Sequence, residues 1–267
     1  MRAPMARPTE PTEEIIRIEG RRATLEALRS GARVLRVRVS NRAEPSETLA
    51  ELEREANGRH IRVELVPPST LETMTSTGHH QGVIADVRAP EPLDLDALLA
   101  LTMRQNQEPF FVMLDGLQDP QNVGAIARSA EAAGANGLII TEKRAAGITP
   151  GAIRASAGAL LLLPVAVVPN GAKAIEQLKK AEVWVAGTAA TEGKPYSACD
   201  FKGRLVLVIG SEGKGLQRLV QDRCDFLVSI PLKGRVESLN ASAAAAIVLF
   251  EAARQRAAGA PVKAPPT

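Results

Sequence analysis

Six short segments in the second half of the chain are apolar at nearly every position, and this pattern limits the fold more than any other feature. They are FFVML (110–114), GLIIT (137–141), VAVV (165–168), VWVAG (183–187), LVLVIG (205–210) and FLVSI (226–230). A strand with one face in water alternates apolar and polar residues, whereas an uninterrupted apolar strand is buried on both faces. Helical stretches such as NVGAIARSAEAAG and GAKAIEQLKKA separate most of these segments. Alternation of strand and helix predicts an α/β fold with a parallel, doubly wound sheet, whose ligands bind beyond the carboxyl ends of the strands.

The last predicted helix spans residues 239–257 and contains ASAAAAIVLF, which is apolar on nearly every face. A helix of this kind is buried rather than amphipathic. We therefore expect other parts of the protein to cover it on more than one side.

Residues 14–88 have a different pattern, in which apolar and polar residues alternate. VLRVRVS (34–40), IRVELV (61–66) and QGVIADV (81–87) are predicted strands, and helices over 24–30, 47–57 and 69–74 separate them. Ser46 and Ser69 are suited to cap the second and third helices. The pattern predicts a small α/β domain.

The remaining segments are predicted to be connections and tails. Residues 89–109 are bounded by prolines and read as a linker that includes a short amphipathic helix over 93–103, and residues 110–258 then form the second domain. Residues 1–13 and 259–267 are rich in Pro and Ala, which is typical of disordered tails.

The basic residues of the first domain are all arginines. Residues 1–88 contain 14 Arg and no Lys against 13 acidic residues, while the whole chain has a formal net charge of +3. The planar fork of Arg suits phosphates and base edges. The charge therefore permits a nucleic-acid partner, and a simple compositional bias toward Arg stays open as the alternative.

The loop in VLVIGSEGKGL (206–216) holds three glycines, a Glu and a Lys. It is not a phosphate-binding P-loop, because Val208 and Gly215 stand where a Gly and a Ser or Thr are required. Arg218 breaks a dinucleotide fingerprint, and Ile209 breaks a nucleophile elbow. Glu212 would repel a bare phosphate cluster. The loop either approaches a ligand closely or is a tight turn whose glycines permit positive φ.

A second polar stretch, LDGLQDPQNVGAIARSAEAAGA (114–135), follows the first apolar strand. Asp119 and Pro120 are suited to open a helix. Asn122 and Arg128 lie six residues apart, so that one helical face does not hold both. Arg128 stands among small residues, where it requires either a functional partner or a surface salt bridge.

A third stretch, SIPLKGRVESLNASAAAAIVLFEAA (229–253), leads into the last helix. Either Ser238 or Asn240 can cap that helix. Capping explains one of these side chains and leaves the other open to a functional role, together with Lys233 and Arg235 just before them.

In combination and order, NVGAIARSAEAAG, VIGSEGKGL and IPLKGRVESLNASAAAAIVLFE resemble the three motifs of the SpoU branch of the SPOUT RNA methyltransferases, over residues 110–257. The preceding domain, with EGRRATLEALRSG and HHQGVIADV, resembles the ribosomal-protein-like substrate-binding domain of members that act on rRNA. The resemblance implies a trefoil-knotted parallel-sheet domain behind a small α/β domain. The knot would bury the apolar last helix, and a homodimer is implied because two subunits build each active site in this family.

The resemblance also implies a cofactor and a set of site residues. S-adenosylmethionine (SAM) would be held mainly through the backbone of Gly210, Ile230 and Leu239, with Thr188 as a further candidate. The RNA-side set is Asn122, Arg128, Glu212, Ser238 and Asn240. Arg128 would either activate the ribose 2′-hydroxyl or grip the adjacent phosphate, since a guanidinium stays protonated in proteins. The hydroxyl and the loops would be positioned by Asn122, Ser238 and Asn240. Glu212 would order either the substrate or the neighbouring arginine.

The leading functional hypothesis is therefore a SAM-dependent 2′-O-methyltransferase that acts on a guanosine of 23S rRNA. The alternatives are a tRNA ribose methyltransferase and a non-catalytic RNA-binding factor for ribosome assembly, whereas a dehydrogenase lacks its glycine fingerprint. No apolar run reaches the roughly 18 residues that span a bilayer, and the N-terminus lacks an apolar signal core. We expect a cytoplasmic protein without metal, whose Cys199 and Cys224 are reduced and inert.

Overall fold

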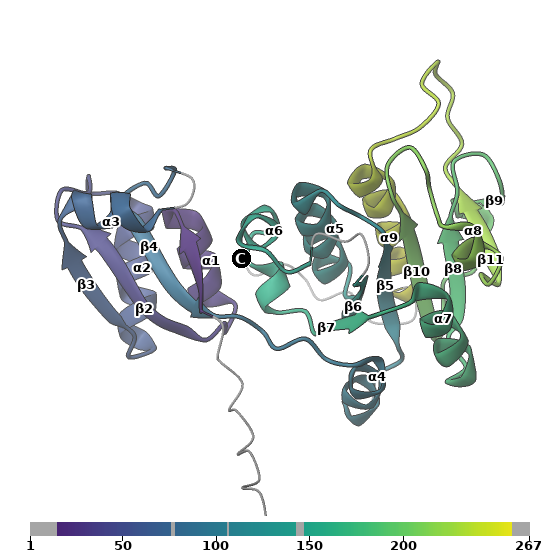
Figure 1. Ribbon diagram of the computed structural model, residues 1–267, viewed down its shortest axis with the longest axis horizontal. Coiled ribbons are helices and arrows are strands. Elements are labelled where there is room, and N and C mark those ends of the chain that lie inside the picture. The colour runs from purple at the N-terminus through teal and green to yellow at the C-terminus, as the bar shows by residue number, and fades with distance from the viewer. Residues whose placement is uncertain (1–14, 76–77, 106, 143–146, 258–267) are drawn as a thin grey trace, which may run out of the picture. The chain divides into compact units, whose positions relative to one another are not determined.

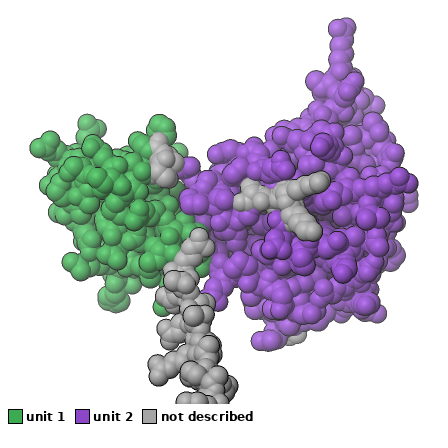
Figure 2. Space-filling model, in the orientation of Figure 1, with its two compact units in different colours: residues 1–89 green, residues 90–267 purple. Residues whose placement is uncertain are grey.

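The computed structural model describes residues 15–75, 78–105, 107–142 and 147–257. The chain divides into two compact units, residues 1–89 and residues 90–267 (Figure 2). Both tails predicted to be disordered, residues 1–13 and 259–267, lie outside the described residues. In the described part of the chain, no helix is both long enough and apolar enough to cross a membrane.

The first unit is a four-stranded sheet in the order β1-β4-β2-β3, in which β2 and β3 are parallel and β4 runs antiparallel to β1 and β2. Its elements are β1 (Ile15–Glu19), α1 (Arg21–Arg29), β2 (Val34–Ser40), α2 (Glu47–Gly58), β3 (Arg62–Val66), α3 (Pro68–Met74) and β4 (Val83–Arg88). The three strands predicted in this unit are confirmed. β1 was not predicted, because this edge strand is stabilised by pairing with β4 at the other end of the unit, which the local sequence does not reveal.

The two predicted helix caps of this unit have different outcomes. Ser46 caps α2, since its hydroxyl accepts a hydrogen bond from the backbone N–H of Leu49 (3.2 Å). The prediction that Ser69 opens the third helix is wrong. That helix begins at Pro68 and Pro67 is its N-cap. Proline suits the first turn because its missing N–H has no partner within the helix there.

The second unit is built on a seven-stranded sheet in the order β7-β6-β5-β10-β8-β11-β9, in which every pairing is parallel (Figure 1). The strands are β5 (Phe110–Asp115), β6 (Gly137–Thr141), β7 (Val165–Val168), β8 (Trp184–Thr188), β9 (Lys194–Pro195), β10 (Leu205–Gly210) and β11 (Phe226–Ser229). The helices are α4 (Leu95–Arg104), α5 (Pro120–Ala132), α6 (Pro150–Ala155), α7 (Gly171–Lys180), α8 (Arg218–Gln221) and α9 (Ala241–Ala257), with 3₁₀ turns over Ala159–Leu161 and Tyr196–Ala198. The α/β class, the parallel sheet and all six apolar strands are confirmed, and the two-residue β9 is an addition.

Helix α4 lies in the segment for which we predicted a linker with a short helix. Leu95, Leu98 and Leu99 are buried in the same cluster as Phe111 and Met113 of β5. The helix therefore contributes to the core of the second unit.

The order of the strands positions the functional site. β10 pairs with β5 at the centre of the sheet although many residues separate them, and β8 and then β11 follow on the other side of β10. The loops after these parallel strands therefore meet at one edge. The knot implied by the resemblance stays a prediction.

Candidate functional site

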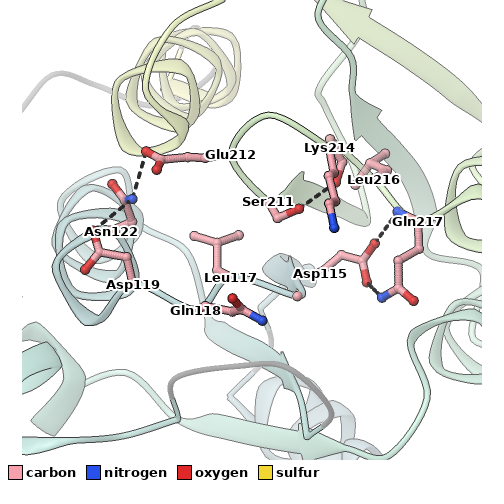
Figure 3. Close-up of a pocket in the computed structure, with 12 residues that line it drawn as sticks. Asp115, Leu117, Gln118, Asp119, Asn122, Ser211, Glu212, Lys214, Leu216 and Gln217 are labelled. Atoms are coloured by element: carbon pink, nitrogen blue, oxygen red, sulfur yellow. Dashed lines mark hydrogen bonds between the residues drawn. The ribbon is translucent and has the colours of Figure 1, made fainter.

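A cavity of about 480 Å³ opens between the loops that follow β5 and β10 (Figure 3). It is lined by Asp115, Gly116, Leu117, Gln118, Asp119, Asn122, Ser211, Glu212, Lys214, Gly215, Leu216 and Gln217. The lining joins residues from two of the three polar stretches, because β5 and β10 are neighbours in the sheet.

Asn122, Glu212 and Asn240 form a hydrogen-bonded group that we call the Asn–Glu cluster. Asn122 Nδ2 and Asn240 Nδ2 both donate to Glu212 Oε1, at 2.9 Å and 2.6 Å, and Asn240 Nδ2 also lies 3.0 Å from Asn122 Oδ1. Asn122 Nδ2 is in addition 3.2 Å from Asp119 Oδ2. Figure 3 shows the side chains of Asn122, on α5, and Glu212, in the loop after β10, pointing toward each other. One carboxylate oxygen therefore holds together the start of α5, the loop after β10 and the start of α9.

Asn240 has a double role at the start of α9. Its Oδ1 accepts from the backbone N–H groups of Ser242 (2.9 Å) and Ala243 (3.3 Å), which is the geometry of an N-cap. Its Nδ2 is then free to join the Asn–Glu cluster. The structure thus decides between the two candidate caps in favour of Asn240. Ser238 is exposed and makes no hydrogen bond with the residues that the structure describes.

Arg128 lies on α5 together with Asn122 but does not reach the Asn–Glu cluster. Six residues on a helix correspond to a rotation of about 240° and a rise of about 9 Å. The side chain of Arg128 is exposed, and it forms neither a hydrogen bond nor an ion pair with any residue in the described ranges. The predicted alternative, a surface salt bridge, is therefore not found among those residues.

Glycine is required in the loop after β10 for two different physical reasons. Ser211 and Gly215 exchange two backbone hydrogen bonds of 3.0 Å and 2.9 Å, and Gly213 and Gly215 have φ angles of 75° and 65°. The tight-turn explanation therefore accounts for these two glycines. Gly210 has a different requirement, because a Cβ there would lie 2.3 Å from the carbonyl carbon of Gly215 and 2.5 Å from the nitrogen of Leu216. The loop folds back so closely over Gly210 that no side chain fits.

None of the four residues predicted to hold SAM belongs to the lining of this cavity. Thr188 ends β8, Gly210 ends β10 and Ile230 follows β11, so that all three occupy the carboxyl ends of neighbouring strands. Thr188 Oγ1 donates to the carbonyl of Val208 in β10 (3.1 Å). Leu239 is partly exposed and directly precedes Asn240.

Asp115 is a site residue that sequence reasoning missed. This buried carboxylate ends β5 and accepts hydrogen bonds from the backbone N–H (2.7 Å) and the Nε2 (2.6 Å) of Gln217. Burial raises the pKa of Asp115, and the two hydrogen bonds from Gln217 oppose that shift. Asp115 ties the loop after β10 to the end of β5. The available signal was an acidic residue that ends an otherwise apolar strand at the ligand edge.

The charges around the cavity disfavour a cluster of phosphates. Asp115, Asp119 and Glu212 contribute carboxyl groups to the lining and Lys214 the single ammonium group. No group of three His, Cys, Asp or Glu side chains suited to a metal ion occurs in the described residues. Both cysteines are free, and burial raises the pKa of Cys224 to about 12, so that its thiolate is scarce at neutral pH.

Comparison with known proteins identifies the family of the chain. Residues 109–250 match the SpoU rRNA methylase family, and residues 17–93 match a domain described as RNA 2′-O ribose methyltransferase substrate binding. The chain is 40% identical over 237 residues to YacO of Bacillus subtilis, described as a TrmH-family tRNA/rRNA methyltransferase, covering 89% of this chain and 94% of the relative. It is 41% identical over 215 residues to the 23S rRNA (guanosine-2′-O-)-methyltransferase RlmB of Coxiella burnetii, covering 80% and 86%.

Solved structures agree with these matches. The structure of the SpoU methyltransferase AviRb from Streptomyces viridochromogenes, in complex with AdoMet, superimposes with a TM-score of 0.73 at 31% identity and covers 92% of both chains. The three polar stretches that build the Asn–Glu cluster lie within or next to the matched range. The chain therefore belongs to the SpoU rRNA methylase family.

Proposed function

We propose that this protein transfers a methyl group from SAM to the ribose 2′-hydroxyl of a guanosine in 23S rRNA. The observation that carries the proposal is the Asn–Glu cluster, in which one carboxylate oxygen joins residues of all three polar stretches at the edge of the cavity. The family supports RNA ribose methylation, and the name of the Coxiella burnetii relative supports a guanosine of 23S rRNA.

The residues present fit SAM, which would supply a methyl group bonded to a positively charged sulfur. Gly210, Ile230, Leu239 and Thr188 stand at or next to neighbouring strand ends and would hold the adenine and ribose, mainly through their backbone. Gly210 leaves no room for a side chain, which suits contact through amide groups. The excess of carboxylates in the nearby cavity is compatible with a cationic ligand. The AdoMet complex of AviRb supports the same cofactor.

The cavity between the β5 and β10 loops would hold the target ribose. Its volume of about 480 Å³ lies within the range of small-molecule sites. The Glu212 carboxylate fixes the amides of Asn122 and Asn240, which would in turn position the 2′-hydroxyl, with Ser238 closing the site. An in-line displacement depends mainly on alignment of the reacting atoms, so that rigid amides are the useful feature here.

In a homodimer, Arg128 of one copy of the chain would reach the Asn–Glu cluster of the other copy. The geometry of α5 directs it away from its own Asn122, and it has no partner among the described residues. Helix α9 also exposes Ile247 and Phe250, at 36% and 52%, although its sequence predicts burial on all sides. A homodimer would cover this apolar face and bring in Arg128, which would activate the hydroxyl or bind the adjacent phosphate.

The test is to incubate the protein with methyl-labelled SAM and separate transcripts of 23S rRNA, 16S rRNA and tRNA, and to map the products by mass spectrometry. We expect the label on the ribose of a guanosine in 23S rRNA. The name of the Bacillus subtilis relative makes tRNA the second candidate. Label in tRNA alone would refute the rRNA assignment, and absence of transfer to all three RNAs would refute the activity.

A further inference from the structure

The four-stranded sheet of the first unit has one face that carries a row of arginines. The register places Arg17 of β1 and Arg36 of β2 on either side of Asp86 of β4, and places Arg62 of β3 beside Arg36. In the next row, Arg38 is paired with Glu64. We call these four arginines, with Asp86 and Glu64, the arginine face.

The opposite face of the sheet is occupied by the hydrophobic core. Side chains alternate along a strand, so that the buried Ile16, Ile18, Val37 and Val39 lie on the other side from the arginines. The helices α1 and α2 pack against the sheet, and the buried Leu28 and Leu52 of these helices belong to the same core. The arginine face is therefore the side of the sheet opposite α1 and α2, and the end of α3 lies beside it, where the carbonyl of Met74 contacts Arg17.

On the arginine face, exposed guanidinium groups lie above the less exposed carboxylates of Asp86 and Glu64. Asp86 is shared by Arg17 (3.9 Å), Arg36 (3.2 Å) and Arg38 (3.0 Å), while Glu64 is shared by Arg38 (3.6 Å) and Arg62 (3.1 Å). The Asp86 side chain is only 8% exposed, against 53%, 43% and 80% for Arg17, Arg36 and Arg62. Four guanidinium groups thus face two recessed carboxylates.

Most hydrogen-bond donors of the outer arginines have no partner among the residues that the structure describes. Arg36 and Arg62 approach their carboxylates through Nε, and neither makes a hydrogen bond that meets normal geometry with any described residue. Arg17 makes one long contact, from Nη1 to the carbonyl of Met74 (3.5 Å). Each guanidinium carries five N–H donors in a planar fork. The carboxylates below lie within ion-pair distance of these forks and leave most of their N–H donors available to a ligand.

We propose that the arginine face binds the phosphate backbone of a double-helical segment of the substrate RNA. The inference rests on the proposed function and names the surface that would carry the RNA. Residues 17–93 match a substrate-binding domain of RNA 2′-O ribose methyltransferases, and the exposed charge is complementary to phosphate. A protein partner is less suited, because the centre of a protein interface is apolar.

The composition of the first unit favours a duplex over a single strand. Residues 1–89 contain no Phe, Tyr or Trp. Recognition of single-stranded RNA relies largely on bases stacked on aromatic rings or Arg planes, and His60, His79 and His80 are the only such rings in this part of the sequence. An RNA duplex is recognised instead through its shape, its phosphates and its 2′-hydroxyls. A row of guanidinium groups without aromatic neighbours is suited to the second kind of contact.

The experiment measures binding of the full-length protein to fluorescent RNA by anisotropy, from low to moderate salt. The RNAs are the fragment of 23S rRNA that is methylated, a perfect hairpin duplex, and an unstructured oligouridine of equal length. The variants are Arg36→Gln/Arg62→Gln and the charge-preserving Arg36→Lys/Arg62→Lys. The control is Arg54→Gln, since Arg54 is an exposed residue of α2 without an ion pair among the described residues. Circular dichroism shows whether each variant is folded.

We expect the glutamine pair to bind the fragment and the duplex about ten-fold more weakly. The negative slope of the logarithm of the association constant against the logarithm of the salt concentration should become shallower by about one to two. The lysine pair should retain most of that slope, and Arg54→Gln should behave as the wild type. A wild-type slope in the glutamine pair, an equal loss in Arg54→Gln, or tighter binding of oligouridine than of duplex would each overturn the inference.

Methyl transfer separates this inference from the proposed function. At saturating RNA the glutamine pair should keep its kcat and show a raised KM for RNA. If the wild-type protein methylates no RNA, the proposed function fails whatever the anisotropy shows. If the wild type methylates rRNA and the glutamine pair has an unchanged KM for RNA, the arginine face does not bind the substrate RNA. The proposed function would still stand in that case.

Discussion

The contact between α5 and α6 provides the most direct test of how the fold positions the site. Gly124 is buried on α5, two residues after Asn122. A Cβ at Gly124 would lie 2.4 Å from the carbonyl oxygen of Ala152, 2.5 Å from the Cβ of Ala155 and 2.8 Å from the nitrogen of Ser156. All three atoms belong to the backbone or to a Cβ, so that no flexible side-chain end can move away. In Gly124→Ala the two helices must separate by about 1 Å to restore normal contacts.

The expected loss of stability follows from two opposing contributions. Overpacking of a rigid contact costs about 3 kcal/mol, at the upper end of its usual range. Replacing a glycine in a helix by alanine stabilises the helix by about 1 kcal/mol. The net loss for Gly124→Ala is about 2 kcal/mol, which lowers Tm by roughly 4–8 °C for a unit of this size.

The assay is thermal unfolding followed by far-UV circular dichroism, which reports the loss of helix in a cooperative transition. The control is Gly58→Ala at the end of α2, where no atom lies within 4 Å of an added Cβ. That variant should unfold at the wild-type temperature or slightly above. Methyl transfer should fall in Gly124→Ala, because its helix carries Asn122, and should be unchanged in the control. A Tm of Gly124→Ala at or above the wild-type value would refute the reasoning.

Three further predictions concern the site and the assembly. Arg128→Ala should keep its Kd for SAM by calorimetry while methyl transfer falls roughly 10²-fold or more; loss of SAM binding instead would show that Arg128 belongs to the cofactor site. Burial raises the pKa of Asp115 above 3.8, so that the folded state binds this proton more tightly than the unfolded state and is stabilised as pH falls through the raised pKa. In urea unfolding from about pH 7 to pH 4, the wild type should therefore gain stability relative to Asp115→Asn, and the opposite trend would contradict the assignment. Phe250→Glu should convert a dimer into a monomer in sedimentation velocity, whereas a variant that stays dimeric would place the interface elsewhere.

Local sequence determined the elements of the second unit because each of its strands is buried on both faces. A strand of this kind is recognised from five or six consecutive apolar residues, as in FFVML and LVLVIG. Its prediction therefore does not depend on knowing which strand it pairs with. The same holds for helix caps that act within one turn, such as Asp119 and Ser46. The edge strand β1 was missed because it is defined by its pairing with β4.

The chemistry of the site could be predicted only as a set of residues. Resemblance of the three polar stretches to family motifs indicated Asn122, Glu212 and Asn240, but not that both amides donate to one carboxylate oxygen. Asp115 gave no signal of its own beyond its place at a strand end. The sequence left open whether Ser238 or Asn240 caps α9, since that choice depends on backbone geometry.

By itself, then, the sequence determined the class of the fold, the strands and helices of the sheet, and the family, since these depend on short-range patterns of burial and on motif order. Tertiary structure alone decided which loops meet. β5 and β10 are distant in the chain and become neighbours only because long-range pairing in the sheet outweighs chain connectivity. That pairing brings the Asn–Glu cluster together, while the period of α5 turns Arg128 away from it, and the register of a second sheet places Arg17, Arg36 and Arg62 in one row.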